Sequence, residues 1–140
     1  MVQNVVELPN LENTSNLYLD FETTSGDPKL DSLNPWFHCS IAGIAIGNEK
    51  SSWYIPVGHN DVRWNLDKDV VFKWLTQILL TCEEWVNHNI KYDAHVAANS
   101  KLPIPARLVD TLTLAKLVNS DRYRYGLKYL GKDENFKTCV

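Results

Sequence analysis

The stretch "NLYLDFETTS" (residues 16–25) decides the fold, because its leucine and phenylalanine residues alternate with polar ones. A period of two predicts a strand over 17–22 with one apolar face, and the Thr-Thr-Ser-Gly-Asp-Pro cluster that follows predicts a turn. Asp20 and Glu22 are two positions apart, so both carboxylates project from the face opposite the apolar one. Two adjacent carboxylates repel each other, and we therefore expect a cation between them.

Hard divalent cations such as Mg²⁺ take oxygen ligands, typically one or two carboxylates together with water and substrate phosphate. A structural alternative is that one carboxylate caps a neighbouring element while the other is exposed at the end of the strand. A further carboxylate favours the metal hypothesis: "VNHNIKYDAHV" (86–96) contains Asn89 and Asp93, four residues apart, which would lie one above the other if this segment is helical. Ligands gather at strand ends in α/β folds, so we expect Asp93 to face Asp20 and Glu22.

Changes of periodicity along the chain predict the remaining elements. We expect a hairpin over 39–47 and 51–58, helices over 67–81, 91–100 and 112–120, short strands over 83–89 and 106–111, and one or two helical turns within 125–140. Three strands in meander order, followed by helices that alternate with short strands, predict an α/β fold. Its mixed sheet has antiparallel first three strands and helices packed on it. A length of 140 residues favours one domain, 1–140.

The composition is that of a globular protein, with 44% hydrophobic and 22% charged residues and a net charge of −3. Three cysteines in no metal-binding spacing indicate free thiols in a reducing compartment. The sequence contains neither a signal-peptide pattern nor a run of eighteen apolar residues. We therefore expect a cytoplasmic protein without a membrane partner.

Positive charge gathers late in the chain, where 116–132 carries five Lys and Arg residues against the single acidic residue Asp121. Such a stretch can follow a phosphate backbone, and a solvated helix face explains it equally well.

Four stretches, in order, resemble the 3′–5′ proofreading exonuclease domain of family A DNA polymerases, in the DEDD exonuclease superfamily that includes ribonuclease D. They are "YLDFETT", "YIPVGH", "NHNIKYDAHV" and "VDTLTLAKLV…YGLKYLG", and they extend from about Leu17 to Gly131. The resemblance implies a ribonuclease H-like fold. It also implies hydrolysis of the terminal phosphodiester at the 3′ end of single-stranded DNA by two Mg²⁺ or Mn²⁺ ions. RNA stays an alternative substrate, because ribonuclease D shares the carboxylate plan.

The resemblance also implies a role for each matching residue. Asp20 would bridge both metal ions, and Glu22 would ligate the ion that holds the attacking water. Asp93 would hold the second ion near the leaving 3′ oxygen. Thr23 and Asn89 would contact the terminal nucleotide or orient the ligands.

The sequence departs from the family pattern in two places. Relatives carry a third motif, Y-x-x-x-D or H-x-x-x-D, after the stretch that matches "YGLKYLG"; Tyr129 to Asp133 has this pattern but overlaps that stretch. Where polymerase relatives often carry a leucine that wedges against the terminal base, this chain has Gly26. We therefore expect an exonuclease-like domain that is incomplete at its C-terminus and truncated before the third motif.

Two hypotheses follow about activity and partners. In the first, the chain is a proofreading-type exonuclease of a phage or bacterium, associated with a DNA polymerase domain or with a separate chain that supplies the third motif. In the second, it is a catalytically impaired module that binds nucleic acid or a polymerase partner.

Overall fold

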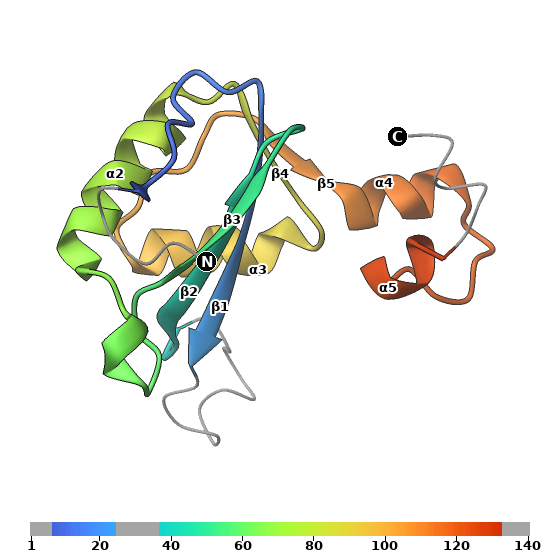
Figure 1. The fold of residues 1–140 in the computed structure, drawn as a ribbon. Helices are drawn as coiled ribbons and strands as arrows, with labels where there is room; N and C mark the ends of the chain where they lie inside the picture. Colours follow the sequence, from blue (N-terminus) through green and yellow to red (C-terminus); the bar gives the residue numbers. More distant parts are fainter. Residues whose placement is uncertain (1–6, 25–36, 133–140) are drawn as a thin grey trace.

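The computed structural model describes residues 7–24 and 37–132, and its centre is a five-stranded sheet in the order β3-β2-β1-β4-β5 (Figure 1). The strands are β1 (Asn16–Thr24), β2 (Ser40–Gly47), β3 (Ser52–Pro56), β4 (Glu84–Asn87) and β5 (Leu108–Asp110). β1, β2 and β3 pair antiparallel, whereas β4 pairs parallel with both β1 and β5. The predicted mixed sheet with antiparallel first three strands is confirmed.

The α-helices follow the predicted order, and they are α2 (Lys68–Thr81), α3 (Ile90–Asn99), α4 (Thr111–Val118) and α5 (Leu127–Leu130). The 3₁₀ helix η2 (Val62–Trp64) was not predicted. None of these described helices is long and apolar enough to cross a membrane.

One predicted boundary is wrong, because β1 does not turn after Glu22 but continues through Thr24. Thr23 pairs with Ile41 and Thr24 with Ser40, so β2 supplies ladder partners for two residues that the sequence assigned to a turn. The register shifts between Glu22 and Thr23, which marks a β-bulge opposite this point. Threonine is β-branched and is favoured in strands, so pairing with β2 keeps Thr23 and Thr24 in the strand despite the turn-forming residues that follow.

The start of α2 is determined locally. Asp67 is the N-cap, and its carboxylate accepts hydrogen bonds of 3.0 Å from the N–H of Asp69 and 3.1 Å from that of Val70. These bonds satisfy two of the free N–H groups of the first turn. The buried residues of the helix recur at steps of three and four and form one apolar face: Val71, Leu75, Ile78 and Leu79.

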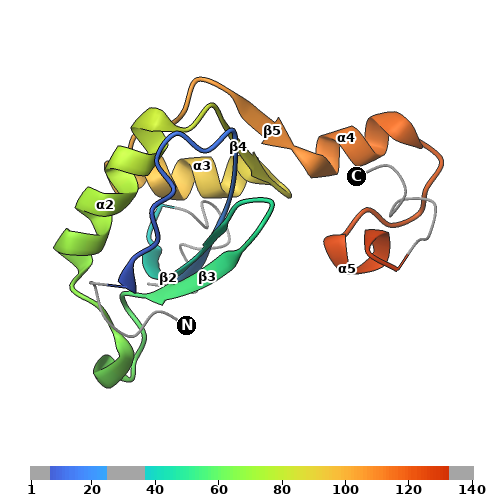
Figure 2. The same cartoon turned by 45° about the horizontal axis from the view of Figure 1, so that its top comes forward.

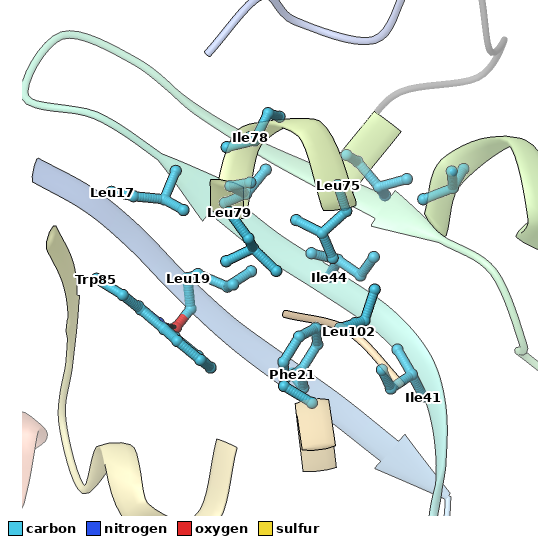
Figure 3. Packing of buried hydrophobic residues seen from close by; sticks show 14 of the residues in the cluster. Leu17, Leu19, Phe21, Ile41, Ile44, Leu75, Ile78, Leu79, Trp85 and Leu102 are labelled. Atoms are coloured by element: carbon cyan, nitrogen blue, oxygen red, sulfur yellow. Dashed lines mark hydrogen bonds between the residues drawn. The ribbon is translucent and has the colours of Figure 1, made fainter. Parts of the chain in front are cut away.

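The hydrophobic core lies on one face of the sheet, where the apolar side chains of α2 pack against those of β1 and β2 (Figure 3). Buried residues of α3 belong to the same cluster. Leu17, Leu19 and Phe21 point into it and are at most 5% exposed. Trp85 of β4 is fully buried, packs edge-on against Phe21 and donates a 2.9 Å hydrogen bond from Nε1 to the carbonyl of Leu19. Because β1 uses alternate residues for the core, Asp20 and Glu22 lie on the opposite face.

Both views show α4 and α5 on the far side of β5 from α2 (Figures 1 and 2). Thr111 at the start of α4 and Leu127 and Leu130 of α5 line a cavity together with Asp20, so these helices approach the face of the sheet that carries the acidic residues of β1.

Candidate active site

The first two predicted site residues, Asp20 and Glu22, are both exposed on the uncovered face of β1. The Asp20 carboxylate accepts a 3.2 Å hydrogen bond from Nδ2 of Asn87, the last residue of β4. The carboxylate is thus oriented by the neighbouring parallel strand. Sequence reasoning did not single out Asn87.

The third predicted residue, Asp93, lies in the first turn of α3 and is 3% exposed. It is the one polar or charged residue that is buried within the ranges 7–24 and 37–132. Its Oδ1 accepts a 2.8 Å hydrogen bond from the backbone N–H of Phe21, the residue between Asp20 and Glu22. This bond places Asp93 beside β1, next to the strand positions that carry Asp20 and Glu22.

The geometry of β1 explains why this N–H group is available. β1 and β4 pair only from Asn16 to Tyr18, so the rest of that edge of β1 has no strand partner. Side chains replace the missing strand as hydrogen-bond partners. The Trp85 indole donates to the carbonyl of Leu19, and the Asp93 carboxylate accepts from the N–H of Phe21. A buried backbone donor must find an acceptor, and here the acceptor is the candidate metal ligand itself.

Burial, and secondarily the negative charge of Asp20, raise the pKa of Asp93 to about 6, against the opposing effect of hydrogen bonds from Phe21 and Asn87. Asp20 and Asp93 are therefore close enough to repel each other. A cation at this place would relieve both the repulsion and the cost of burying a charge.

The two predicted substrate contacts, Asn89 and Thr23, both lie next to α3. Asn89 does not stack above Asp93 on a helix, because α3 begins at Ile90 and Asn89 is its N-cap, with φ of 66° in the left-handed region. Its backbone N–H donates a 2.9 Å hydrogen bond to Asp110, which holds this conformation, and its side chain is exposed. Thr23 is half-buried, with its Oγ1 2.9 Å from the hydroxyl of Tyr92 on α3.

Asp110 is a structural residue that the sequence analysis missed. It ends β5, caps α4 and accepts hydrogen bonds from the N–H of Asn89, the N–H of Leu112 and Oγ1 of Thr113. Although burial acts in the opposite direction, these hydrogen bonds lower its pKa. The signal was present as an Asp directly before a helix, the usual N-cap pattern.

Tyr54 of β3 also lies on this face, and its hydroxyl is 2.6 Å from Nε2 of His59. A Cβ at Gly43 would collide with the hydroxyl and ring of Tyr54, so the tyrosine lies directly over this glycine. Gly43 is the pairing partner of Glu22 on β1. Burial and the negative charge of Glu22 raise the pKa of Tyr54, consistent with this closeness.

A cavity of about 800 Å³ opens between this face and α5. Its lining includes Asp20, Tyr54 and Asn87 from the sheet, together with His88, Thr111 and Leu127. The Nε2 atom of His88 is buried without a hydrogen-bond partner, while Nδ1 is 3.0 Å from Oγ1 of Thr111. The acidic site therefore adjoins a space large enough for a small ligand.

The residues present fit a hard divalent cation in donor type and charge, since all three candidates are carboxylates and two of them repel each other. Within the part of the chain that the structure describes, no three His, Cys, Asp or Glu side chains are grouped closely enough to hold one ion together. Tyr129 lies in α5, with its hydroxyl accepting a 2.7 Å hydrogen bond from Arg124, whereas Asp133 and Gly26 lie outside the described residues.

The sheet order, the helices on its core face and the acidic strand define a ribonuclease H-like fold, and comparison with solved structures confirms it. NrnC of Brucella melitensis has a TM-score of 0.59 with 19% sequence identity; the match covers 88% of this chain and 54% of NrnC. A structure titled NrnC bound to pGG has a TM-score of 0.57 with 21% identity and the same coverage.

Sequence comparison points to a DNA polymerase. The chain is 30% identical over 127 residues to the DNA polymerase DpoZ of Salmonella phage PMBT28, which covers 89% of this chain and 18% of the polymerase. No family model matches the chain. The chain thus spans less than a fifth of this polymerase and about half of NrnC. Together these matches confirm the resemblance to a part of a DNA polymerase and the ribonuclease H-like fold.

Proposed function

We propose that this chain is a metal-dependent 3′–5′ exonuclease domain that removes nucleotides from the 3′ ends of single-stranded DNA. The observation that carries the proposal is the position of Asp93, which is buried, bonded to the backbone between Asp20 and Glu22, and repelled by Asp20. Burying a carboxylate beside a second one is costly even when it accepts hydrogen bonds, and a bound cation would offset that cost.

The comparisons support this proposal. The matched curated relative is named a DNA polymerase, and a structure of the same fold is described as bound to pGG. Both are consistent with nucleic acid as the partner of the cavity beside Asp20.

In the proposed reaction, a water oxygen forms a bond to the terminal phosphorus while the bond from phosphorus to the preceding 3′ oxygen breaks. One proton of the water passes to the 3′ oxygen and the other to solvent. The products are a nucleoside 5′-monophosphate and a strand shortened by one residue with a free 3′ hydroxyl. Mg²⁺ or Mn²⁺, when bound, supplies the positive charge that activates water and stabilises the developing charge on phosphate.

The residues of the chain hold these groups in place. Asp20, Glu22 and Asp93 would bind the metal ions, with Asn87 and the Phe21 N–H orienting two of the three carboxylates. Thr23 and Asn89 remain candidates for contact with the terminal nucleotide. Thr23 is half-buried and hydrogen-bonded to Tyr92, whereas Asn89 is exposed. Asn89 is therefore the better placed of the two to contact a nucleotide.

A second candidate function is a nucleic-acid-binding module without catalysis. The absence of a three-residue metal cluster within the described ranges favours it, because a nuclease that works with two metal ions needs a complete ligand set. A polymerase domain or a separate chain could complete the site in either case.

The test uses single-stranded DNA labelled at the 3′ end, with Mg²⁺ or Mn²⁺, and compares the wild type with Asp20→Asn and Asp93→Asn. We expect release of labelled mononucleotide, slowed by about 100-fold or more in each variant, which corresponds to about 2.7 kcal/mol. Asp69→Asn, on the exposed side of α2, is the matched control and should keep full activity. Equal activity in all four proteins would refute the site. DNA binding without cleavage would favour the second function, and a matched RNA strand would decide the substrate class.

A further inference from the structure

Within the described residues, Glu22 differs from the other two candidate ligands because its carboxylate has no hydrogen-bond partner. Asn87 orients Asp20 and the Phe21 N–H orients Asp93, whereas no described residue forms a hydrogen bond with the Glu22 carboxylate. Glu22 is also exposed and has a longer side chain than aspartate. A ligand of this kind loses rotamer freedom when it binds, so a site that uses it benefits from a group that restricts it.

Tyr54 is placed to be that group. On β3 it pairs with Ala45, which pairs in turn with Asp20. The backbone of Tyr54 is therefore in register with Asp20, two residues along β1 from Glu22. Its ring leans along the sheet onto Gly43, the partner of Glu22. Any residue other than glycine at position 43 would block this path. The Tyr54 hydroxyl thereby crosses β2 toward Glu22.

The hydroxyl is itself held from behind. His59 lies 2.6 Å away through Nε2, and its backbone is fixed by two 2.8 Å hydrogen bonds with the Asn65 side chain, one in each direction. When Nε2 carries the proton, it donates to the tyrosine oxygen, and the phenol hydrogen is free to point at another acceptor. Asn65, His59 and Tyr54 thus form a chain of hydrogen bonds that orients the Tyr54 hydroxyl.

We propose that Tyr54, braced by His59, is a positioning residue for Glu22, donating a hydrogen bond that holds the carboxylate in its metal-binding orientation. The assignment rests on the proposed function for the identity of Glu22 as a metal ligand. It extends that function to β3, since none of the three acidic residues comes from this strand.

The first experiment measures Mn²⁺ binding, without nucleic acid, from the electron paramagnetic resonance signal of the free ion. Four proteins form a double-mutant cycle: wild type, Tyr54→Phe, Glu22→Gln and the double variant. Phenylalanine keeps the ring over Gly43 and removes only the hydroxyl. We expect Tyr54→Phe to weaken Mn²⁺ binding about 10-fold in the wild-type background, equivalent to about 1.4 kcal/mol, and less than two-fold in the Glu22→Gln background.

The matched control is Tyr125→Phe, which also removes a hydrogen-bonded hydroxyl, here one that donates to the carbonyl of Asn119 at 2.7 Å. It should leave Mn²⁺ affinity unchanged. A Tyr54→Phe effect that is absent, or equal in both Glu22 backgrounds, overturns the positioning role. A loss of Mn²⁺ binding that accompanies a lower melting temperature in Tyr54→Phe and is not coupled to Glu22 overturns it as well.

The second experiment follows cleavage. Tyr54→Phe should lower kcat about 10-fold and leave KM within two-fold, because the hydroxyl acts on Glu22 and not on the strand. If the wild type binds Mn²⁺ with the expected coupling but does not cleave DNA, the proposed function fails and the role of Tyr54 stands. If it cleaves DNA without that coupling, the proposed function stands and the role of Tyr54 fails. If it binds no Mn²⁺, both fail.

Discussion

The Asp93 carboxylate accepts a 2.8 Å hydrogen bond from the backbone N–H of Phe21, across a separation of 72 residues in the sequence. This bond joins the first turn of α3 to the middle of β1. It fixes Asp93 against the backbone of the residue that lies between Asp20 and Glu22. The consequences for stability and metal binding follow from the burial of Asp93.

Asp93→Asn should stabilise the metal-free protein at pH 7.5, because it removes a buried charge and keeps an oxygen for the Phe21 N–H. The folded pKa of about 6 lies above the ordinary value of 3.8, so the folded state binds the proton more tightly and loses stability as the pH rises through 6. The shift sets an upper limit of about 3 kcal/mol on the gain. Urea unfolding in EDTA at pH 7.5 and 3.5 measures it, and the gain should disappear at the lower pH. A destabilised variant at pH 7.5 would contradict this account.

Gly43→Ala should destabilise the protein by about 1–3 kcal/mol, because the new methyl group collides with Tyr54. In a Tyr54→Ala background the same substitution should cost much less, since the collision is gone. Urea unfolding of the four proteins gives the coupling. Gly126→Ala is the control: its Cβ would lie 3.5 Å from Tyr129, an ordinary contact. Equal costs at Gly43 in both backgrounds would exclude the collision.

Asp110→Ala should cost about 1–2 kcal/mol, since the capping acceptor of α4 is lost and the Asn89 N–H loses its partner. Asp110→Asn keeps one oxygen and should cost less. The lowered pKa of Asp110 means that its ionised form stabilises the fold above the ordinary carboxyl pKa and that this advantage is lost as the pH falls below it. Unfolding at pH 7 and pH 3 checks the sign, and a difference between wild type and Asp110→Asn that grows at pH 3 would contradict it.

Mg²⁺ should raise the melting temperature of the wild type, because a ligand that binds only the folded state stabilises it by about 2.7 kcal/mol at 100 times its dissociation constant. The increase should be largely lost in Asp20→Asn and retained in Asp69→Asn. Differential scanning fluorimetry over a Mg²⁺ series measures both. An equal increase in Asp20→Asn would place the ion elsewhere.

Local patterns predicted most of the elements, and the reason is physical. Alternation along 17–22 decides which side chains of β1 enter the core, and it therefore also decides that Asp20 and Glu22 share the other face. Asp67 and the apolar periodicity behind it determine where α2 begins and which side it buries. These features depend on neighbours within a few residues, so they can be derived from the sequence.

The predictions that failed depended on distant partners. The left-handed backbone of Asn89 is held by Asp110, and the extension of β1 through Thr24 depends on β2. No local pattern indicates either of them. The predicted stacking of Asn89 on Asp93 requires Asn89 to lie within the helix, whereas α3 begins one residue later, at Ile90.

The sequence alone determined most of the strands and helices, the mixed sheet and the face of β1 that carries Asp20 and Glu22, because periodicity and capping act over a few residues. Only the tertiary structure decided that Asp93 is buried against the Phe21 N–H and that Tyr54 reaches over Gly43 toward Glu22. In the first, β1 has no strand partner at Phe21, and Asp93 supplies the missing acceptor. In the second, Gly43 has no side chain, and Tyr54 occupies the space above it. Such partners are chosen by packing in three dimensions, where separation along the chain no longer matters.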